Sequence, residues 1–343
     1  MVNLTNVFML AQTGNLIGDW LYGLSNSIGN FGWTVVVFTI ILKLVTSPFD
    51  IWQKVVMRKN NNAMKRMKPE LEKLQKQYAN NQQLLAEKQM QLYKREHFST
   101  LGACLPMIIT MVIFFVVFAG FNATVQYQNK VVFLELQQTY NVAEQEANAD
   151  ATLTTDEAKQ QYINEKVLEK YEGEIRAKQG FLWIENIFMP DTWSKPIPAW
   201  GTFIGTGMGK LNIQIPGLES REYQKVMSPI IAKYNTRWNG YLILPILAFV
   251  LNVVTSKMMQ KSNPQMPQAG SAEMQKANQL NMKMMQWLMP IMMLVFAVLY
   301  SSAFTLYMFV SALVTTLFQL ITNLAFKIID KKAEEKKLST TYK

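Results

Sequence analysis

Apolar residues along this chain are gathered into long blocks, and most polar residues lie between them. The blocks cover residues 31–52, 101–121, 241–259 and 284–326. A helix needs about 20 mostly apolar residues to cross a bilayer. The last block is long enough for two such helices, with a turn at Ser301 and Ser302. The pattern therefore predicts an all-α membrane protein with five transmembrane helices.

A shorter amphipathic stretch precedes the first block. Its apolar residues recur at the spacing of one helix face: Ile17, Trp20, Leu21, Leu24 and Ile28. We expect a helix that lies in the membrane interface. The apolar run VFML at 7–10 is too short for a cleavable signal peptide, and no basic residue precedes it. We therefore expect the first span to act as its own insertion signal.

Composition supports a membrane protein and argues against disulfide, metal, catalytic and nucleotide-binding sites. Half of the 343 residues are hydrophobic and 17% are charged. One cysteine, Cys104, and one histidine, His97, allow neither an intramolecular disulfide nor a clustered His/Cys metal site. Ser301 and Ser302 lack a histidine partner, Asp50 lacks a paired carboxylate, and no G-x-x-x-x-G-K nucleotide motif occurs. We expect no enzyme activity, no cofactor, no metal and no nucleic acid substrate.

The distribution of basic residues orients the spans. Residues 53–100 carry 11 Lys/Arg against 4 Asp/Glu, residues 257–283 carry 4 against 1, and residues 327–343 carry 6 against 3. The connection 122–240 carries 12 against 14, and residues 1–30 have no Lys or Arg. Cytoplasmic loops are enriched in Lys and Arg. We therefore expect a multi-pass protein with its N-terminus outside and its C-terminus in the cytoplasm.

This orientation assigns a place to every segment. In chain order we expect an extracytoplasmic interfacial helix at 1–30, the first span at 31–52, a cytoplasmic helical hairpin at 53–100, the second span at 101–121, an extracytoplasmic helical insertion at 122–240, the third span at 241–259, a cytoplasmic loop at 260–283, the fourth and fifth spans at 284–326, and a basic cytoplasmic tail at 327–343.

The hairpin should turn at Asn80 and Asn81, with leucines and tyrosines joining its two arms. The other faces of the arms are basic. Two interpretations stay open: a solvated hairpin without a specific partner, or a surface that docks on an anionic body such as a ribosome. The basic tail at 327–343 allows the same two interpretations.

One cation, Lys43, lies in none of the basic or extracytoplasmic segments. A lysine near the middle of a bilayer costs about 2.5 to 3.5 kcal/mol on insertion scales. Thr39, Lys43 and Ser47 are spaced four residues apart and fall close to one helix face. Lys43 either snorkels to the cytoplasmic headgroups or faces a water-filled recess within the bundle. The other spans hold no acidic partner, so we expect hydration to compensate the charge.

Several segments together resemble the YidC family of membrane protein insertases. They are TIILKLVTSP in the first span, the run from Met67 to Pro106, FLWIENIFMPDTW before the third span, and MMQWLMPIMMLVF with SSAFTLYMFVSAL in the last two. The resemblance implies a bacterial cytoplasmic membrane protein with five helices around a hydrophilic groove. This groove would be closed on the outside and open to the cytoplasm and the lipid.

The resemblance also implies a set of groove residues. Lys43 stands where the family has an arginine, and Thr39, one turn away, falls at a position that faces the substrate. Tyr307 matches the first aromatic residue of a Leu-Tyr-aromatic motif. Asn252 and Ser256 fall near a polar groove position of the third span. Lysine keeps the charge of arginine but not its planar fork, and Met308 replaces the second aromatic residue.

The function implied is that of a membrane protein insertase and chaperone. It would take nascent membrane proteins into a hydrated, positively charged groove and release their apolar helices into the lipid bilayer. The ribosome and the Sec translocon are further candidate partners of such an insertase. The alternative is a small-anion transporter or channel that uses Lys43. Such proteins often show inverted repeats or several intramembrane charges, and neither is evident in this sequence.

Overall fold

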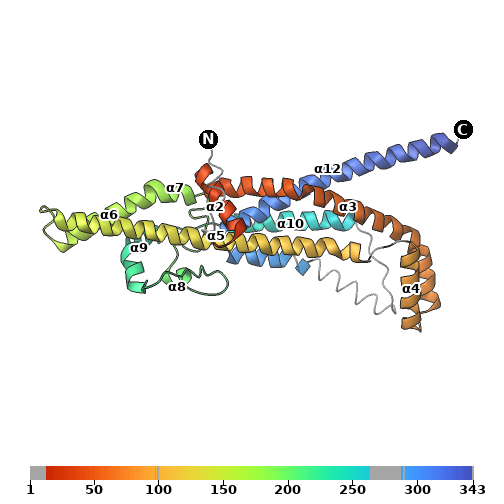
Figure 1. Cartoon of the computed structure of the whole chain (residues 1–343), viewed down its shortest axis with the longest axis horizontal. Coiled ribbons are helices and arrows are strands. Elements are labelled where there is room, and N and C mark those ends of the chain that lie inside the picture. The colour runs from red at the N-terminus through yellow and green to blue at the C-terminus, as the bar shows by residue number, and fades with distance from the viewer. Residues whose placement is uncertain (1–12, 97, 99, 263–286, 289, 342–343) are drawn as a thin grey trace. The chain divides into compact units, whose positions relative to one another are not determined.

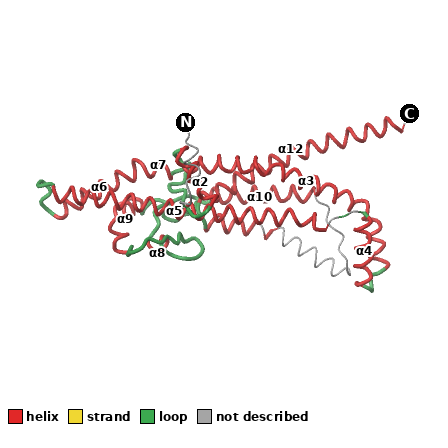
Figure 2. Tube along the Cα trace, in the orientation of Figure 1, coloured by secondary structure: helices red, strands yellow, loops and turns green. Residues whose placement is uncertain are grey.

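The computed structural model describes residues 13–96, 98, 100–262, 287–288 and 290–341. These residues are mostly helical, and their only β-type pairing is an isolated bridge between Phe181 and Ile184 (Figure 1; Figure 2). The predicted all-α membrane protein is confirmed, because three of the helices are long and apolar enough to cross a membrane. His97 and most of the predicted loop at 260–283 lie outside the described residues.

The chain forms two compact units, each assembled from three stretches of sequence. The first unit consists of Met1–Thr39, Met111–Ala248 and Met293–Met308. The second consists of Ile40–Thr110, Phe249–Met292 and Phe309–Lys343. The long helices pass through the boundaries between these stretches, so both units draw on them.

In the first unit, the amphipathic stretch folds as α2 (Leu16–Ile28). The Asn15 side chain accepts hydrogen bonds from the backbone amides of Ile17 and Gly18, which are otherwise unpaired at a helix start. The helix ends at Gly29, whose φ of 82° suits glycine. Leu21 is fully buried, and the ring of Trp20 lies 4.9 Å from that of Phe38.

Helix α3 (Phe31–Gln77) begins at the first apolar block and continues well beyond it. Asn30 caps its start, accepting hydrogen bonds from Gly32 N and Trp33 N. The helix then passes Pro48 and Pro69 without ending. The first span and the first arm of the predicted hairpin are therefore one continuous helix.

Helix α5 (Thr100–Ala149) also extends far past its apolar block, into the predicted insertion. The elements that follow it are α6 (Asp156–Lys170), the π-helix η1 (Tyr171–Ile175), α7 (Arg176–Gln179), α8 (Trp200–Phe203) and α9 (Ser220–Tyr234). Aromatic contacts join α5 to α8 and α9: the ring of Phe133 lies 5.6 Å from that of Phe203 and 5.4 Å from that of Tyr223. The Tyr223 hydroxyl donates to the carbonyl of Pro198 at 2.6 Å, so its one polar group is satisfied.

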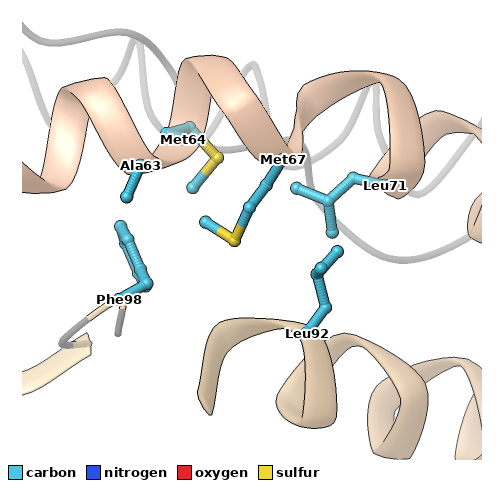
Figure 3. Close-up of a cluster of buried hydrophobic side chains, with 6 residues drawn as sticks. All are labelled: Ala63, Met64, Met67, Leu71, Leu92 and Phe98. Atoms are coloured by element: carbon cyan, nitrogen blue, oxygen red, sulfur yellow. The ribbon is translucent and has the colours of Figure 1, made fainter. Parts of the chain in front are cut away.

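In the second unit, α3 and α4 (Gln82–Arg95) form a helical hairpin. Asn81 caps α4 by accepting a hydrogen bond from Leu84 N at 3.1 Å. The two arms share a buried apolar cluster, drawn in Figure 3: Ala63, Met64, Met67, Leu71, Leu92 and Phe98. An ion pair between Arg95 and Glu70 links the arms at the surface. The hairpin thus has a core of its own.

The described residues of the remaining apolar blocks are mostly helical as well. They form α10 (Ile243–Ser262), the helix Pro290–Leu299 and α12 (Ser302–Thr341). The three long apolar candidates are Phe31–Gln77, Ile108–Ala149 and Ser302–Ile329, and two shorter apolar helices are Ile243–Met258 and Pro290–Leu299. Helix α12 carries the basic tail as a continuous extension, so this tail is helical through Thr341.

Candidate functional site

Lys43 lies half-buried on α3, one turn after the fully buried Thr39. Its neighbours Ile40 and Leu44 are exposed, Leu44 to 67%. Asp50, about two turns further along the same helix, attracts Lys43 electrostatically. The sequence shows no acidic residue in the other spans, and this partner lies on the helix of Lys43 itself. The ammonium group is therefore balanced in part by protein charge.

Ser47 has a structural role that follows from Pro48. Proline has no N–H, so the helix carbonyl four residues earlier, that of Leu44, loses its usual donor. The Ser47 hydroxyl donates to this Leu44 carbonyl at 2.8 Å. Such compensation lets a proline persist in a membrane helix. Ser47 thus stabilises the turn that carries Lys43.

Two of the predicted groove residues belong to the first unit. The Thr39 hydroxyl donates to the carbonyl of Val35 at 2.6 Å, and the side chain is fully buried. Tyr307 is also buried, with its ring 5.4 Å from that of Phe121 and 5.9 Å from that of Phe304. In this structure both side chains are packed within the unit.

The other predicted residues, Asn252 and Ser256, lie in the second unit together with Lys43 and Ser47. Both are half-buried on α10. Between them lies Thr255, which sequence reasoning does not single out. Thr255 is buried, and its Oγ1 lies 2.6 Å from Oγ1 of Thr316 on α12. A threonine hydroxyl commonly bonds its own helix, so the sequence gives no sign of this contact.

Cationic side chains join α3 to α12 in the same unit. Lys54 Nζ donates to the Thr322 hydroxyl and to the carbonyl of Phe318, and lies 4.6 Å from the centre of the Phe318 ring. One turn further, the guanidinium of Arg58 lies 4.7 Å from the ring of Phe326. These cation–π contacts hold the two helices together beyond Lys43 and Asp50.

A buried acceptor lies on the same stretch of α12. The side-chain oxygen of Gln319 is buried and has no hydrogen-bond partner among the described residues. A buried polar atom without a partner is costly. Together with Thr316 and Thr322, it makes this part of α12 markedly polar for an apolar helix. A polar peptide or water can satisfy such groups.

The segment FLWIENIFMPDTW organises the first unit by joining two helix starts. The buried carboxylate of Asp191 accepts hydrogen bonds from Tyr241 N at 2.8 Å and Leu244 N at 2.7 Å, at the start of α10. The carbonyl of Met189 accepts from Ser302 N at 2.9 Å and from the Ser302 hydroxyl at 2.7 Å, at the start of α12. The motif therefore connects the starts of α10 and α12 through buried hydrogen bonds.

The chemistry of the site is polar and electrostatic. In the part of the chain that the structure describes, no group of three or more His, Cys, Asp or Glu side chains could hold a metal ion. The groups present are ammonium, guanidinium, hydroxyl and amide groups and one carboxylate, distributed over helices with apolar surfaces. They can attract and hydrogen-bond a polar or acidic peptide.

Comparison with known proteins agrees with the resemblance. The sequence model of the 60Kd inner membrane protein family matches residues 23–331. The chain is similar to the membrane protein insertase YidC of Fusobacterium nucleatum, with 36% identity over 108 residues, which are 30% of this chain and 51% of that protein. It is also similar to YidC of Leptospira interrogans, with 23% identity over 222 residues, 64% of this chain and 26% of that protein. For YidC of Helicobacter pylori the identity is 34% over 100 residues, 29% of this chain and 17% of that protein.

The chain thus matches 51% of the Fusobacterium nucleatum relative and 26% of the Leptospira interrogans relative. The family match, in contrast, runs through nearly the whole chain. With its long apolar helices, this match makes the chain a multi-pass protein of the bacterial inner membrane. The chain belongs to the 60Kd inner membrane protein family, which is the family of the YidC insertases.

Proposed function

We propose that the chain is a membrane protein insertase and chaperone. It receives the polar segment of a nascent membrane protein in a hydrated, positively charged intramembrane groove and releases the apolar helix into the bilayer. The observation that carries the proposal is Lys43, a half-buried cation in an apolar stretch of α3, beside the exposed Ile40 and Leu44. The insertase names of the relatives support the same function.

The arrangement of α3 supports different roles for two of its faces, one for the apolar helix of a client and one for its polar segment. Six of its exposed apolar residues follow one stripe along the helix: Trp33, Val37, Ile40, Leu44, Ile51 and Val55. Val45 and Trp52 are also exposed, on the side away from the cations. At about 100° per residue, Lys43, Asp50 and Lys54 fall together on an adjoining stripe, roughly 80° around the helix. A client can therefore keep its apolar helix against the exposed stripe while its polar segment stays near the cations.

The energetics favour this path. Burying an apolar client helix in lipid releases about 0.8 kcal/mol per buried CH₂ group. The opposing cost is that of moving polar groups through the apolar layer, where each charged residue costs about 2.5 to 3.5 kcal/mol on insertion scales. A wet cationic recess lowers this cost, most strongly for acidic segments. The proposed mechanism needs no nucleotide.

The membrane orientation proposed for this function follows the basic segments, with the N-terminus outside and the C-terminus in the cytoplasm. The hairpin then lies in the cytoplasm, where its exposed basic residues can meet the ribosome: Lys65, Lys68, Lys73 and Lys76. Reversing these four charges should weaken co-sedimentation with ribosomes that carry a client. Contact with the Sec translocon remains part of the proposal, to be tested by crosslinking in membranes.

Insertion of a client with an acidic tail into proteoliposomes tests the role of Lys43. Lys43→Arg should insert it normally, whereas Lys43→Ala and Lys43→Glu should impair it, because the attraction is lost or reversed. A client with a neutral tail should be less affected. The matched control is Lys257→Ala, which removes an exposed lysine from α10 of the same unit and should change little. Full activity of Lys43→Glu with the acidic client would refute the electrostatic mechanism.

Photo-crosslinking to a stalled client tests whether its polar and apolar parts contact different faces of α3. Because Thr39 and Tyr307 are buried, the proposal requires that an entering client opens the packing around them. A photoreactive residue at position 39 or 307 should then capture the polar segment of the client, and one at the exposed position 37 should capture its apolar helix. Positions 37 and 39 are two residues apart, so they differ mainly in the face they occupy. The same client residues crosslinking equally to both positions would argue against a groove.

A further inference from the structure

Exposed apolar side chains gather on two loops of the first unit, residues 180–199 and 235–242, and on the first turn of α3. Leu182 is 72% exposed and Trp193 is 58% exposed. Trp238 and Tyr241 are about half exposed, and Trp33, on the first turn of α3, is 56% exposed. Large apolar side chains at such exposure are usually covered by something in the native environment.

The backbone presents Leu182 outward in an unusual conformation. Phe181 and Ile184 exchange two backbone hydrogen bonds of 2.9 Å, which close a tight turn with Leu182 inside it. The φ of Leu182 is 53°, in the left-handed region that leucine rarely adopts. A residue such as asparagine or glycine would fit this backbone more easily. The turn therefore carries an apolar tip at a position where the backbone alone favours a polar or small residue.

The turn is fixed against the start of α3. The Asn30 side chain donates to the carbonyl of Gly180 at 2.8 Å and to that of Ala177 at 3.0 Å. A Cβ atom on Gly32 would lie 2.1 Å from Cδ2 of Phe181, so glycine is needed for the ring to seat there. The ring of Trp33 meets that of Phe181 at 5.5 Å, edge to face. Leu182 and Trp33 thus lie together at the first turn of a membrane helix.

The second loop is fixed against the start of α10. Asp191 binds the backbone amides of Tyr241 and Leu244, and Asn239 N donates to the carbonyl of Ser194 at 2.8 Å. Gly240 N donates to the carbonyl of Thr192 at 3.0 Å. These bonds place the neighbouring exposed Trp193 beside the chain entering α10. The two loops are also tied to each other, because the Asn239 side chain donates to the carbonyl of Asn186 at 3.0 Å.

We infer that these loops form an interfacial anchor, in which Leu182, Trp33, Trp193, Trp238 and Tyr241 enter the lipid headgroup region of the leaflet where α3 and α10 begin. The occupant is lipid because the exposed side chains continue into the exposed apolar faces of the two helices, Val37 on α3 and Ile246 and Leu247 on α10. Tryptophan and tyrosine are enriched at this depth of a bilayer. The inference rests on the membrane assignment and is independent of insertase activity.

The anchor acts through apolar and aromatic contact, with little contribution from anionic lipid. Two of the nearby cations are engaged within the protein: Lys195 Nζ donates to the carbonyl of Asn235, and Arg237 pairs with Glu185 at 3.0 Å. Binding to the headgroup region should therefore be similar in zwitterionic and anionic bilayers, and insensitive to salt. An electrostatic anchor would behave in the opposite way.

The test places an environment-sensitive fluorophore at single cysteines in the full chain, after Cys104→Ser removes the only native thiol. Labelled Leu182→Cys and Trp193→Cys should show blue-shifted emission in phosphatidylcholine vesicles. Lipids spin-labelled near the headgroup should quench them more strongly than lipids labelled near the bilayer centre. The control is Val142→Cys, an exposed apolar position on the extension of α5, which should stay unquenched.

Three outcomes would overturn the inference. Emission and quenching at 182 and 193 equal to those at 142 would mean that the loops face water. Blue-shifted emission without quenching by lipid would mean that protein covers them. Quenching that requires phosphatidylglycerol and disappears in salt would mean that charge drives the contact. As a second variant, Leu182→Asn suits the left-handed backbone and should preserve folding, while it weakens the quenching of a label at 193.

Discussion

The hydroxyl oxygens of Thr255 on α10 and Thr316 on α12 lie 2.6 Å apart, inside the second unit. Each hydroxyl also lies 2.8 Å from a carbonyl of its own helix, Leu251 for Thr255 and Ala312 for Thr316. Because a hydroxyl has one proton, one threonine donates to its own helix and accepts the proton of the other. The pair is thus a polar link between two apolar helices, and it lies next to the predicted groove residues Asn252 and Ser256. Polar contacts of this kind help to fix how membrane helices pack.

We predict a measurable coupling between these two threonines. Thr255→Val and Thr316→Val should each lower the unfolding free energy in detergent, and the double variant should lose less than the sum. The coupling should be about 0.5 to 1.5 kcal/mol, the range found for hydrogen bonds between membrane helices. Strictly additive losses would show that the short contact contributes nothing.

Removing the Asp191 carboxylate should destabilise the first unit. Asp191→Ala leaves the amides of Tyr241 and Leu244 unpaired in a buried place, and we expect a loss of about 2 to 4 kcal/mol in unfolding free energy. Asp191→Asn keeps one acceptor and should fall between alanine and the native chain. The matched control is Asp150→Ala, at an exposed turn where the carboxylate accepts from the amide and hydroxyl of Thr152. Water can replace these bonds, so this variant should lose less than Asp191→Ala. A thermal unfolding series in detergent measures all three.

Two glycines should respond oppositely to alanine. A Cβ atom on Gly120 would lie 2.5 Å from Cβ of Ile17, so Gly120→Ala should separate α2 from α5 and cost about 1 to 3 kcal/mol. Gly23, inside α2, has nothing within 4 Å of the added atom. Gly23→Ala should therefore stabilise the chain by about 0.5 to 1 kcal/mol, because alanine favours a helix. Equal destabilisation by both variants would contradict the close packing at Gly120.

Acid should weaken the part of the first unit around Glu172. The ammonium of Lys233 lies 2.6 Å from Glu172, and its hydrogen bond holds the pKa of that carboxyl below the ordinary value. Because the folded pKa is lowered, the stabilisation is present above the unfolded pKa and is lost as pH falls through the folded one. Glu172→Gln should therefore reduce the dependence of the unfolding midpoint on pH below about pH 4.5. An unchanged acid profile would refute the contribution of this pair.

The sequence by itself determined the elements that depend on local or bilayer-imposed patterns. An apolar block must be long enough to cross a bilayer, so the membrane helices can be recognised from length and composition. Helix α2 follows from its apolar spacing, and the structure adds that Asn15 and Gly29 cap its two ends. Lys43 stands out because a cation in an apolar block is costly wherever the helix packs. The motifs of the family were also sufficient to recognise it.

Only the tertiary structure decided how polar groups meet across the fold. The apolar pattern did not predict that α3 would continue from Phe31 to Gln77 past two prolines, because the serine that compensates Pro48 is ordinary in sequence. Asp191 looked like part of a motif, yet its hydrogen bonds reach residues about 50 positions away. Thr255 and Thr316 are separated by 61 residues. Periodicity reports which side of a helix is apolar, whereas a contact between distant residues depends on how the helices pack together.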